Sequence, residues 1–217
     1  MTRWGWERWA ALSGLVAVAL WVIGVVIDES SNLPGDDPNE ILSWFQDESN
    51  TILAGAFIFM LGSLFFLIFI GGLRVRLVRA ESESAFLTAI AFGAGLVVVA
   101  MTLLIQGPNL SGALAEDELT PEAAQALSVV DDAFFVGAEL AAALLLAATG
   151  LAILRYGALP RWVAWISFLF ALWLLIPPIG WAGLLVGVPL WTIIVAVLLW
   201  MRSGDDSAAA RAPGSVY

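Results

Sequence analysis

Six stretches of this chain are long and almost entirely apolar. Five carry no charged residue, and the sixth contains only Glu139. About 20 residues in a helix, at 1.5 Å each, cross a hydrocarbon core about 30 Å thick. Because lipid offers the backbone no hydrogen-bond partners, such stretches fold as helices. The sequence therefore predicts an all-α, polytopic membrane protein with six transmembrane helices, at about 9–27, 52–73, 85–105, 133–154, 162–179 and 181–201.

These helices are expected to form a single transmembrane domain over residues 1–202. The remaining residues, 203–217, are expected to form a flexible cytoplasmic tail. Over the whole chain, 13% of the residues are charged and 61% are hydrophobic. Soluble globular domains carry about 25% charged residues, so the composition agrees with a membrane protein.

Missing residue types exclude several kinds of chemistry. The chain has no cysteine, no histidine and no lysine. It therefore lacks a thiol nucleophile, a disulfide, the usual ligands of zinc or haem, and a lysine for a Schiff base. We expect no enzymatic activity and no cofactor. The net charge of −10 also argues against a nucleic-acid partner, which would require a basic surface.

The arginines predict the orientation. All nine basic residues lie outside the predicted helices. They precede the first helix, lie between the second and third or between the fourth and fifth, or follow the sixth: Arg3, Arg8, Arg74, Arg76, Arg79, Arg155, Arg161, Arg202 and Arg211. Alternating helices put these segments on one side, which the positive-inside rule makes cytoplasmic. Both termini are then cytoplasmic. The acidic loops 28–50 and 107–132 face outward from the plasma (inner) membrane of a prokaryote.

Each acidic loop contains a signal for the start of a helix. Asp37-Pro38 and Thr120-Pro121 both place an N-cap residue before a proline suited to the first helical position. A short helix is therefore predicted in each loop. The first would present Ile41, Leu42, Trp44 and Phe45 to the membrane surface or to the end of the bundle. The similarity between NLPG at 32–35 and NLSG at 109–112 suggests that the two loops descend from a duplicated helix–loop–helix unit.

The same loops would attract cations to the outer face. A calcium site could take its oxygen ligands from acids within 36–40 or within 116–118. Neither cluster has the alternating spacing and the glycine of an EF-hand loop. The pattern therefore favours a solvated acidic surface.

Glu139 is the charged residue inside an apolar run. It lies about 9 Å below the outer start of that run, on a helix rich in alanine and glycine. Small residues allow close helix packing, which predicts a central helix with Glu139 facing protein or a cavity. The candidate intramembrane polar site combines Glu139 with Thr102 and Gln106 of the third helix, and with Asp131 or Asp132 at its mouth. It could bind a proton or cation, or serve only as a buried hydrogen-bonding group.

Two short motifs carry a resemblance to a known family. They are Asp-Ala-Phe-Phe-Val-Gly at 132–137 and Tyr-Gly-Ala-Leu-Pro at 156–160. They resemble a group of uncharacterised bacterial six-helix membrane proteins that share a domain of unknown function. The resemblance covers about the last ninety residues and implies six helices but no activity. In that group the position of Phe134 is often histidine, a residue that this chain lacks.

Two hypotheses for function follow from the sequence. In the first, the protein is a non-enzymatic component that binds, senses or assembles, with the lipid bilayer as its surroundings. In the second, it is a small proton- or cation-linked transporter or channel that uses Glu139. Transporter sites are often marked by interrupted helices at matching positions of two halves. The only strong break here, Ile176-Pro177-Pro178, coincides with a turn, which favours the first hypothesis.

Overall fold

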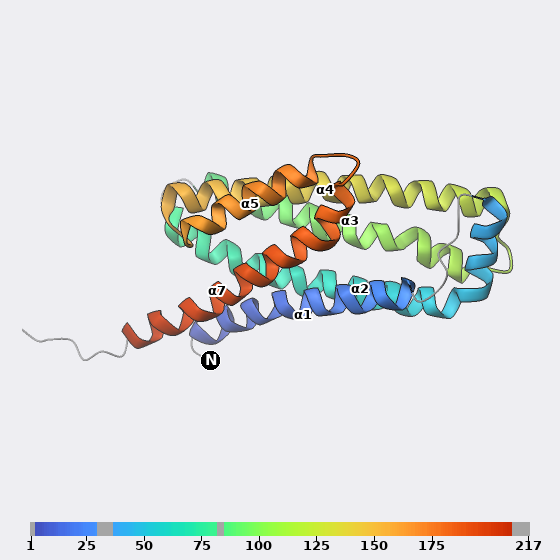
Figure 1. Ribbon diagram of the computed structural model, residues 1–217. Coiled ribbons are helices and arrows are strands. Elements are labelled where there is room, and N and C mark those ends of the chain that lie inside the picture. The colour runs from blue at the N-terminus through green and yellow to red at the C-terminus, as the bar shows by residue number, and fades with distance from the viewer. Residues whose placement is uncertain (1–2, 30–36, 82–84, 210–217) are drawn as a thin grey trace, which may run out of the picture.

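The computed structural model describes residues 3–29, 37–81 and 85–209, which fold into a bundle of antiparallel helices (Figure 1). The elements are α1 (Arg3–Glu29), α2 (Pro38–Glu81), α3 (Phe86–Leu114), α4 (Pro121–Tyr156), α5 (Arg161–Leu174), α6 (Gly180–Ala182), the π-helical η1 (Gly183–Gly187) and α7 (Val188–Ala209). The last three follow one another without a break. The described part of the chain is thus all-α, as predicted, and the protein is a multi-pass membrane protein.

The fifth crossing differs from the prediction. Five segments are long and apolar enough to cross a membrane, but α5 has only 14 residues and spans about 21 Å. The helix predicted for 162–179 ends at Leu174 because Pro177 and Pro178 follow, and the residue before a proline is displaced from the helical region. The α5–α7 hairpin is consequently shorter than its neighbours.

Other helices are longer than predicted. Helix α3 continues past Pro108 to Leu114, and α4 begins at Pro121, so 115–120 is the only non-helical part of the predicted loop 107–132. The helix-start signal at Thr120-Pro121 is correct, since Thr120 accepts a hydrogen bond from the Ala123 amide at 3.3 Å. However, the helix that it starts is continuous with the membrane span. Helix α7 likewise runs to Ala209, beyond the predicted helix end.

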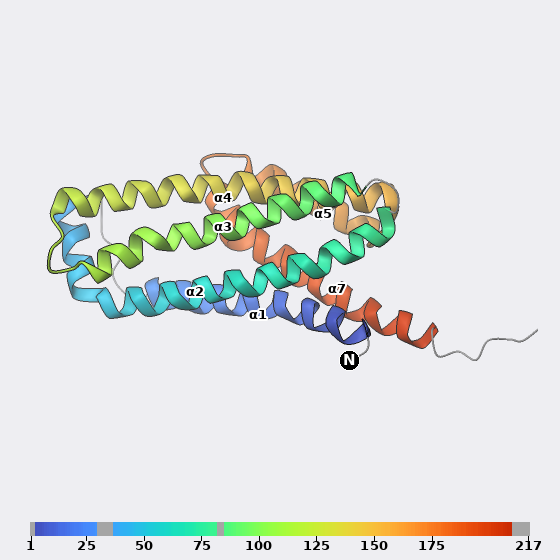
Figure 2. The same cartoon turned by 180° about the vertical axis from the view of Figure 1, so that it is seen from behind.

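The helix predicted after Asp37 also forms, and Asp37 caps it by accepting from the Asn39 amide at 2.8 Å. These hydrogen bonds from Asn39 lower the pKa of Asp37 below its usual value. This first arm of α2 crosses the ends of α3 and α4 (Figures 1 and 2), bending into the span at Glu48. Its apolar residues contact α3 and α4 in one small cluster: Ile41, Trp44, Phe45, Ile52, Ala113 and Ala124. The arm therefore caps the bundle. Asn109–Gly112 lies within α3, whereas 32–35 lies outside the described residues.

Helix α4 lies at the centre of the bundle. It packs against α2, α3, α5, α6 and η1. In its most apolar stretch 67% of the residues are buried, against 39–44% in the other four spans. Its alanines and glycines permit this close packing, as the sequence predicted.

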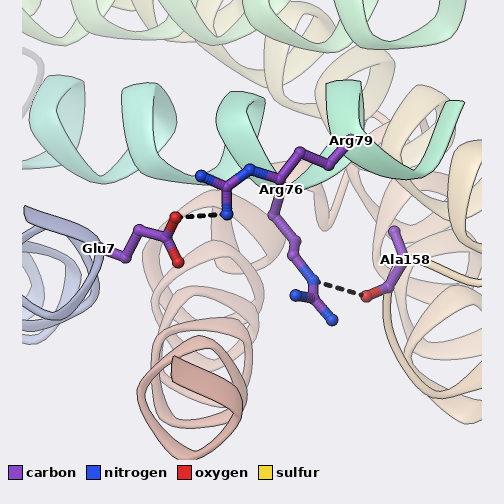
Figure 3. A network of polar contacts seen from close by, with 4 residues as sticks. All are labelled: Glu7, Arg76, Arg79 and Ala158. Atoms are coloured by element: carbon purple, nitrogen blue, oxygen red, sulfur yellow. Dashed lines mark hydrogen bonds and ion pairs between the residues drawn. The ribbon is translucent and has the colours of Figure 1, made fainter. Parts of the chain in front are cut away.

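The first and last helices meet at one end of the bundle, where α1 begins and α7 ends (Figure 1). We call this the arginine end; it contains Arg8, Arg74, Arg76, Arg79, Arg155, Arg161 and Arg202. Figure 3 shows Arg79 of α2 paired with Glu7 of α1, and Arg76 Nε donating to the Ala158 carbonyl at 3.2 Å. Arg202 of α7 donates to the same carbonyl at 3.0 Å. The cytoplasmic orientation of this end stays a prediction.

Two indole–hydroxyl hydrogen bonds join neighbouring helices. Trp21 of α1 donates to Ser63 of α2 at 3.1 Å, and Trp191 of α7 donates to Ser167 of α5 at 2.8 Å. Each serine donates in turn to a carbonyl of its own helix. Buried polar groups in a membrane bundle are thereby satisfied between helices, at a typical gain of about 0.6 kcal/mol each.

Glycines set the close approach of α1 to α2. A Cβ at Gly24 would lie 2.9 Å from the Gly55 carbonyl oxygen, and one at Gly55 would lie 3.0 Å from that of Gly24. Further along the pair, a Cβ at Gly72 would lie 2.4 Å from the Ala10 Cβ. Neighbouring Gly71 has no atom within 4 Å of its Cβ position. The two adjacent glycines therefore face different surroundings.

This difference predicts opposite effects for the two alanine substitutions. Gly72→Ala should destabilise the protein by about 1–3 kcal/mol because it overpacks the α1–α2 contact. Gly71→Ala should be neutral or stabilising by up to about 1 kcal/mol, because alanine is the better helix former. Thermal unfolding in detergent measures both. Equal destabilisation by the two substitutions would contradict the packing described here.

Glu81 caps the start of α3 from the end of α2. Its carboxylate is buried and accepts from the Leu87 and Thr88 amides, both at 2.9 Å, and from the Thr88 hydroxyl at 2.7 Å. These amides belong to the first turn of α3, where no residue of the helix can accept from them. The residue at the N-cap position, Ala85, has a left-handed backbone (φ 48°) and makes no side-chain cap.

We expect Glu81→Ala to lower the free energy of unfolding by about 1–3 kcal/mol, because it leaves buried donors without an acceptor. Asp117→Asn, at an exposed acid, is the control and should change it by less than about 0.5 kcal/mol. Chemical unfolding followed by circular dichroism gives both values. A Glu81→Ala protein as stable as the control would show that the cap contributes nothing.

Candidate functional site

The short α5–α7 hairpin turns back beside the middle of α4, well before the far ends of α3 and α4 (Figure 1). Its turn, 175–179, contains backbone that is not helical. The amides of Leu175, Ile176 and Ile179 donate to carbonyls within the hairpin at 3.0–3.1 Å. The two prolines have no N–H, and the Trp173 indole donates to the Ile179 carbonyl at 3.0 Å. The turn therefore satisfies much of its own backbone in apolar surroundings.

A cavity of about 310 Å³ lies in the half of the bundle opposite the arginine end. Its walls come from α1, α2, α3, α4, η1 and the start of α7. The lining is largely apolar: Trp21, Val22, Val25, Val26, Phe59, Val98, Ile105, Phe135, Leu184, Leu185, Val188 and Pro189. Val22, Val26 and Leu185 line the cavity and are exposed, so the cavity is open at the side of the bundle formed by α1 and η1.

Polar groups of this cavity come from residues near the far ends of three helices: Asp28 of α1, Thr102, Gln106 and Asn109 of α3, and Asp131 of α4. Within 3–29, 37–81 and 85–209, Asp131 Oδ1 is buried and has no hydrogen-bond partner. The Thr102 hydroxyl donates to the Val99 carbonyl at 3.0 Å, which leaves its oxygen able to accept. The cavity is thus apolar with a polar wall that contains two carboxyl groups.

The structure divides the polar site predicted from the sequence. Asp131, Thr102 and Gln106 line the cavity together, but Glu139 and Asp132 are not among its lining residues. Asp132 is exposed on the surface of α4. Asp131 rather than Asp132 therefore stands at the cavity.

Glu139 is buried and points toward the α5–α7 hairpin instead. Its Oε2 lies 2.9 Å from the position that a Cβ at Gly180 would take, and the Leu174 carbonyl oxygen is equally close to that position. The carboxyl thus lies where the chain leaves α5 and enters α6. Gly180 permits this approach, since any larger side chain would meet both oxygens.

Asp28, Asn109 and η1 were missed by the sequence reasoning. Asp28 ends the first apolar run, and that position was a usable signal, because it places the acid at the same depth as Asp131. The π-helical stretch Gly183–Gly187 had no such signal. Its wider turn places Leu184 and Leu185 at the cavity, and π-helical segments often occur at functional sites.

A larger groove, of about 640 Å³, lies between α1 and α2 in the half of the bundle near the arginine end. Its lining is apolar apart from Ser13, Glu7 and Arg79. Ser13 donates to its own helix at Ala10, and Glu7 and Arg79 pair with one another. The groove therefore offers a ligand few polar groups that are not already engaged, and the smaller cavity is the better candidate site.

Within 3–29, 37–81 and 85–209, no three acidic side chains lie close enough to hold a metal ion together. Comparisons with protein-family models, with curated proteins and with solved structures find no match. The resemblance carried by 132–137 and 156–160 stays a hypothesis. In the structure the first motif lies in α4, and the second forms the α4–α5 turn, where Gly157 has the left-handed φ of 70°.

The position of Glu139 is testable through Gly180. We expect Gly180→Ala to destabilise the protein by about 1–3 kcal/mol, because the new methyl group overlaps the Glu139 carboxyl and the Leu174 carbonyl. Adding Glu139→Ala should recover part of this loss. Gly187→Ala is the matched control, since its methyl group would lie 3.6 Å from the nearest atom, Phe170 Cδ1. Thermal unfolding compares the wild type with Gly180→Ala, Glu139→Ala, the double variant and Gly187→Ala, and purely additive losses in the double variant would contradict the contact.

Proposed function

We propose that the protein binds an amphiphilic molecule, taken from the surrounding bilayer, in the cavity between α1, α3, α4 and η1. The observation that carries the proposal is the composition of the cavity. A ligand site of about 300–1,000 Å³ typically has apolar walls and a few convergent polar groups. This cavity has about 310 Å³, apolar walls and a polar region at the far ends of the helices.

The sideways opening supports a ligand that arrives through the membrane. Val22 and Val26 of α1 and Leu185 of η1 line the cavity and are exposed. A molecule in the bilayer can therefore reach the cavity without crossing an aqueous phase. Its apolar chain would contact the valines and leucines, and its head group would contact Gln106, Asn109 and the carboxyl groups.

Binding fits this site better than catalysis. The polar residues of the cavity are carboxyl, amide and hydroxyl groups, and the chain has no histidine, cysteine or lysine to activate a nucleophile. We therefore propose a non-enzymatic role. The acidic far end would face outward and the arginine end would face the cytoplasm, in accordance with the positive-inside rule. The ligand then comes from the outer leaflet.

Transport through Glu139 has less support. A proton or cation path would need Glu139 to communicate with the other polar residues of the outer half. Asp131, Thr102 and Gln106 line the cavity, whereas Glu139 is not among its lining residues and contacts the neighbourhood of Gly180. The described contacts therefore favour a binding or sensing component over the transporter.

Filling the cavity from its rim tests the proposal. In detergent, dodecanol should raise the unfolding temperature of the wild type, since a ligand at a hundred times its Kd adds about 2.7 kcal/mol of stability. Val26→Trp should abolish this shift because the indole occupies the cavity. Ile23→Trp is the matched control, since Ile23 is similarly exposed on α1 but does not line the cavity. Equal shifts in the wild type and both variants would show that dodecanol binds elsewhere.

A further inference from the structure

We infer that the head group recognised in this cavity is an organic ammonium group, so that the ligand is a long-chain amine or a lipid with a cationic head. This inference rests on the proposed function, and it adds the chemical class of the ligand. It stands on three observations: the carboxyl groups at the polar wall, the hydrogen-bonding capacity of their neighbours, and the apolar character of the remaining lining.

Asp131 is the first observation. It lines the cavity, and its Oδ1 is buried without a hydrogen-bond partner among the residues that the structure describes. Asp28 of α1 lines the same cavity, and its charge acts on that of Asp131. No basic residue is found among the described residues of the cavity lining. Two carboxylates that face a low-dielectric cavity repel one another, and this repulsion is relieved by protonation of one of them or by a positive group between them. A cationic ligand supplies that group.

The neighbouring polar groups also suit a donor. The Thr102 hydroxyl donates its hydrogen bond to the Val99 carbonyl, so toward the cavity its oxygen can only accept. Gln106 and Asn109 each add an amide oxygen. An ammonium group has three N–H donors and no acceptor, which matches a wall made of carboxylate, amide and hydroxyl oxygens. An anionic head group would instead meet two carboxyl groups with no arginine to offset them.

A metal ion fits the cavity less well than an ammonium group. Hard cations such as calcium take six to eight oxygen ligands, often from several carboxylates. The described residues contain no group of three acids that could hold a metal, and most of this lining consists of valine, leucine, isoleucine and aromatic side chains. If the cation carries a hydrocarbon chain, the apolar walls can pack against that chain. The charge and the apolar lining are then both matched by one molecule.

The experiment compares three probes that share one chain: dodecylamine, dodecanol and dodecanoate. Their affinities for the full-length protein in a non-ionic detergent are measured by isothermal titration calorimetry. Dodecylamine should bind the wild type about tenfold or more tightly than dodecanol, and dodecanoate most weakly, because a charge-assisted hydrogen bond is about twice as strong as a neutral one. Equal affinities for the amine and the alcohol would overturn the inference.

Substitution of Asp131 tests the residue that carries the inference. Asp131→Asn keeps the shape of the side chain and should weaken dodecylamine binding about tenfold while leaving dodecanol binding within about twofold. Asp132→Asn removes the adjacent, exposed carboxyl and should change neither. Asp28→Asn should act in the same direction as Asp131→Asn. A loss of amine binding as large in Asp132→Asn as in Asp131→Asn would mean that general surface charge attracts the amine.

The rim variant separates failure of this inference from failure of the proposed function. If Val26→Trp abolishes binding of all three probes but Asp131→Asn has no effect on the amine, the cavity binds amphiphiles without preference for a cation. If Val26→Trp leaves binding of all three unchanged, the cavity is not the site, and both proposals are wrong.

Discussion

Every peptide group in a membrane must find its hydrogen-bond partner within the protein, and this constraint shapes the α5–α7 hairpin. Helix α5 is too short to reach the level of its neighbours, so the turn that follows lies beside the middle of α4. Fewer of its backbone groups need a partner, because Pro177 and Pro178 have no N–H, and the Trp173 indole donates to the Ile179 carbonyl. The break in the last crossing is therefore compatible with apolar surroundings.

The position of the turn has consequences for the rest of the bundle. Beyond it, α3 and α4 continue without the α5–α7 hairpin beside them, and the cavity lies next to the turn, between these helices, α1 and the start of α7. Helix η1, just after the turn, forms one wall. The first arm of α2 packs across the ends of α3 and α4. The same short helix thus accounts for the site of Glu139, which contacts the turn, and for the cavity at Asp131.

Much of the fold could be predicted from the sequence, because the length of an apolar run and the burial of small residues are local properties. Five of the six predicted spans, the central position of α4 and the helix starts at Asp37 and Thr120 are found in the structure, and the sixth run forms the shorter α5. The end of α5 was not predicted, since apolar residues continue on both sides of Leu174. Only the prolines marked the break, and they were interpreted as a turn at the membrane surface.

The candidate site was predicted less well than the fold. Periodicity along α4 could not distinguish Asp131 from Asp132, because the neighbours of each depend on where α1 and η1 lie. Pairing Glu139 with Thr102 and Gln106 rested on depth alone. Asp131 does lie at the same cavity as Thr102 and Gln106. The direction in which the Glu139 side chain points from α4, however, depended on the α5–α7 hairpin. Such directions follow from tertiary packing, which the pattern of one helix does not contain.

The carbonyl of Ala158 has a mechanical consequence. Arg76 of α2 and Arg202 of α7 both donate to this one oxygen, in the turn that joins α4 to α5 (Figure 3 shows the first). Three segments distant in sequence are therefore held at a single point, at the opposite end of the bundle from the cavity. A rigid-body movement of α7 that kept these bonds would be a rotation about this point. Leu185 lies far from Arg202 along η1 and α7, so a small rotation of α7 at the arginines would displace Leu185 by a larger distance.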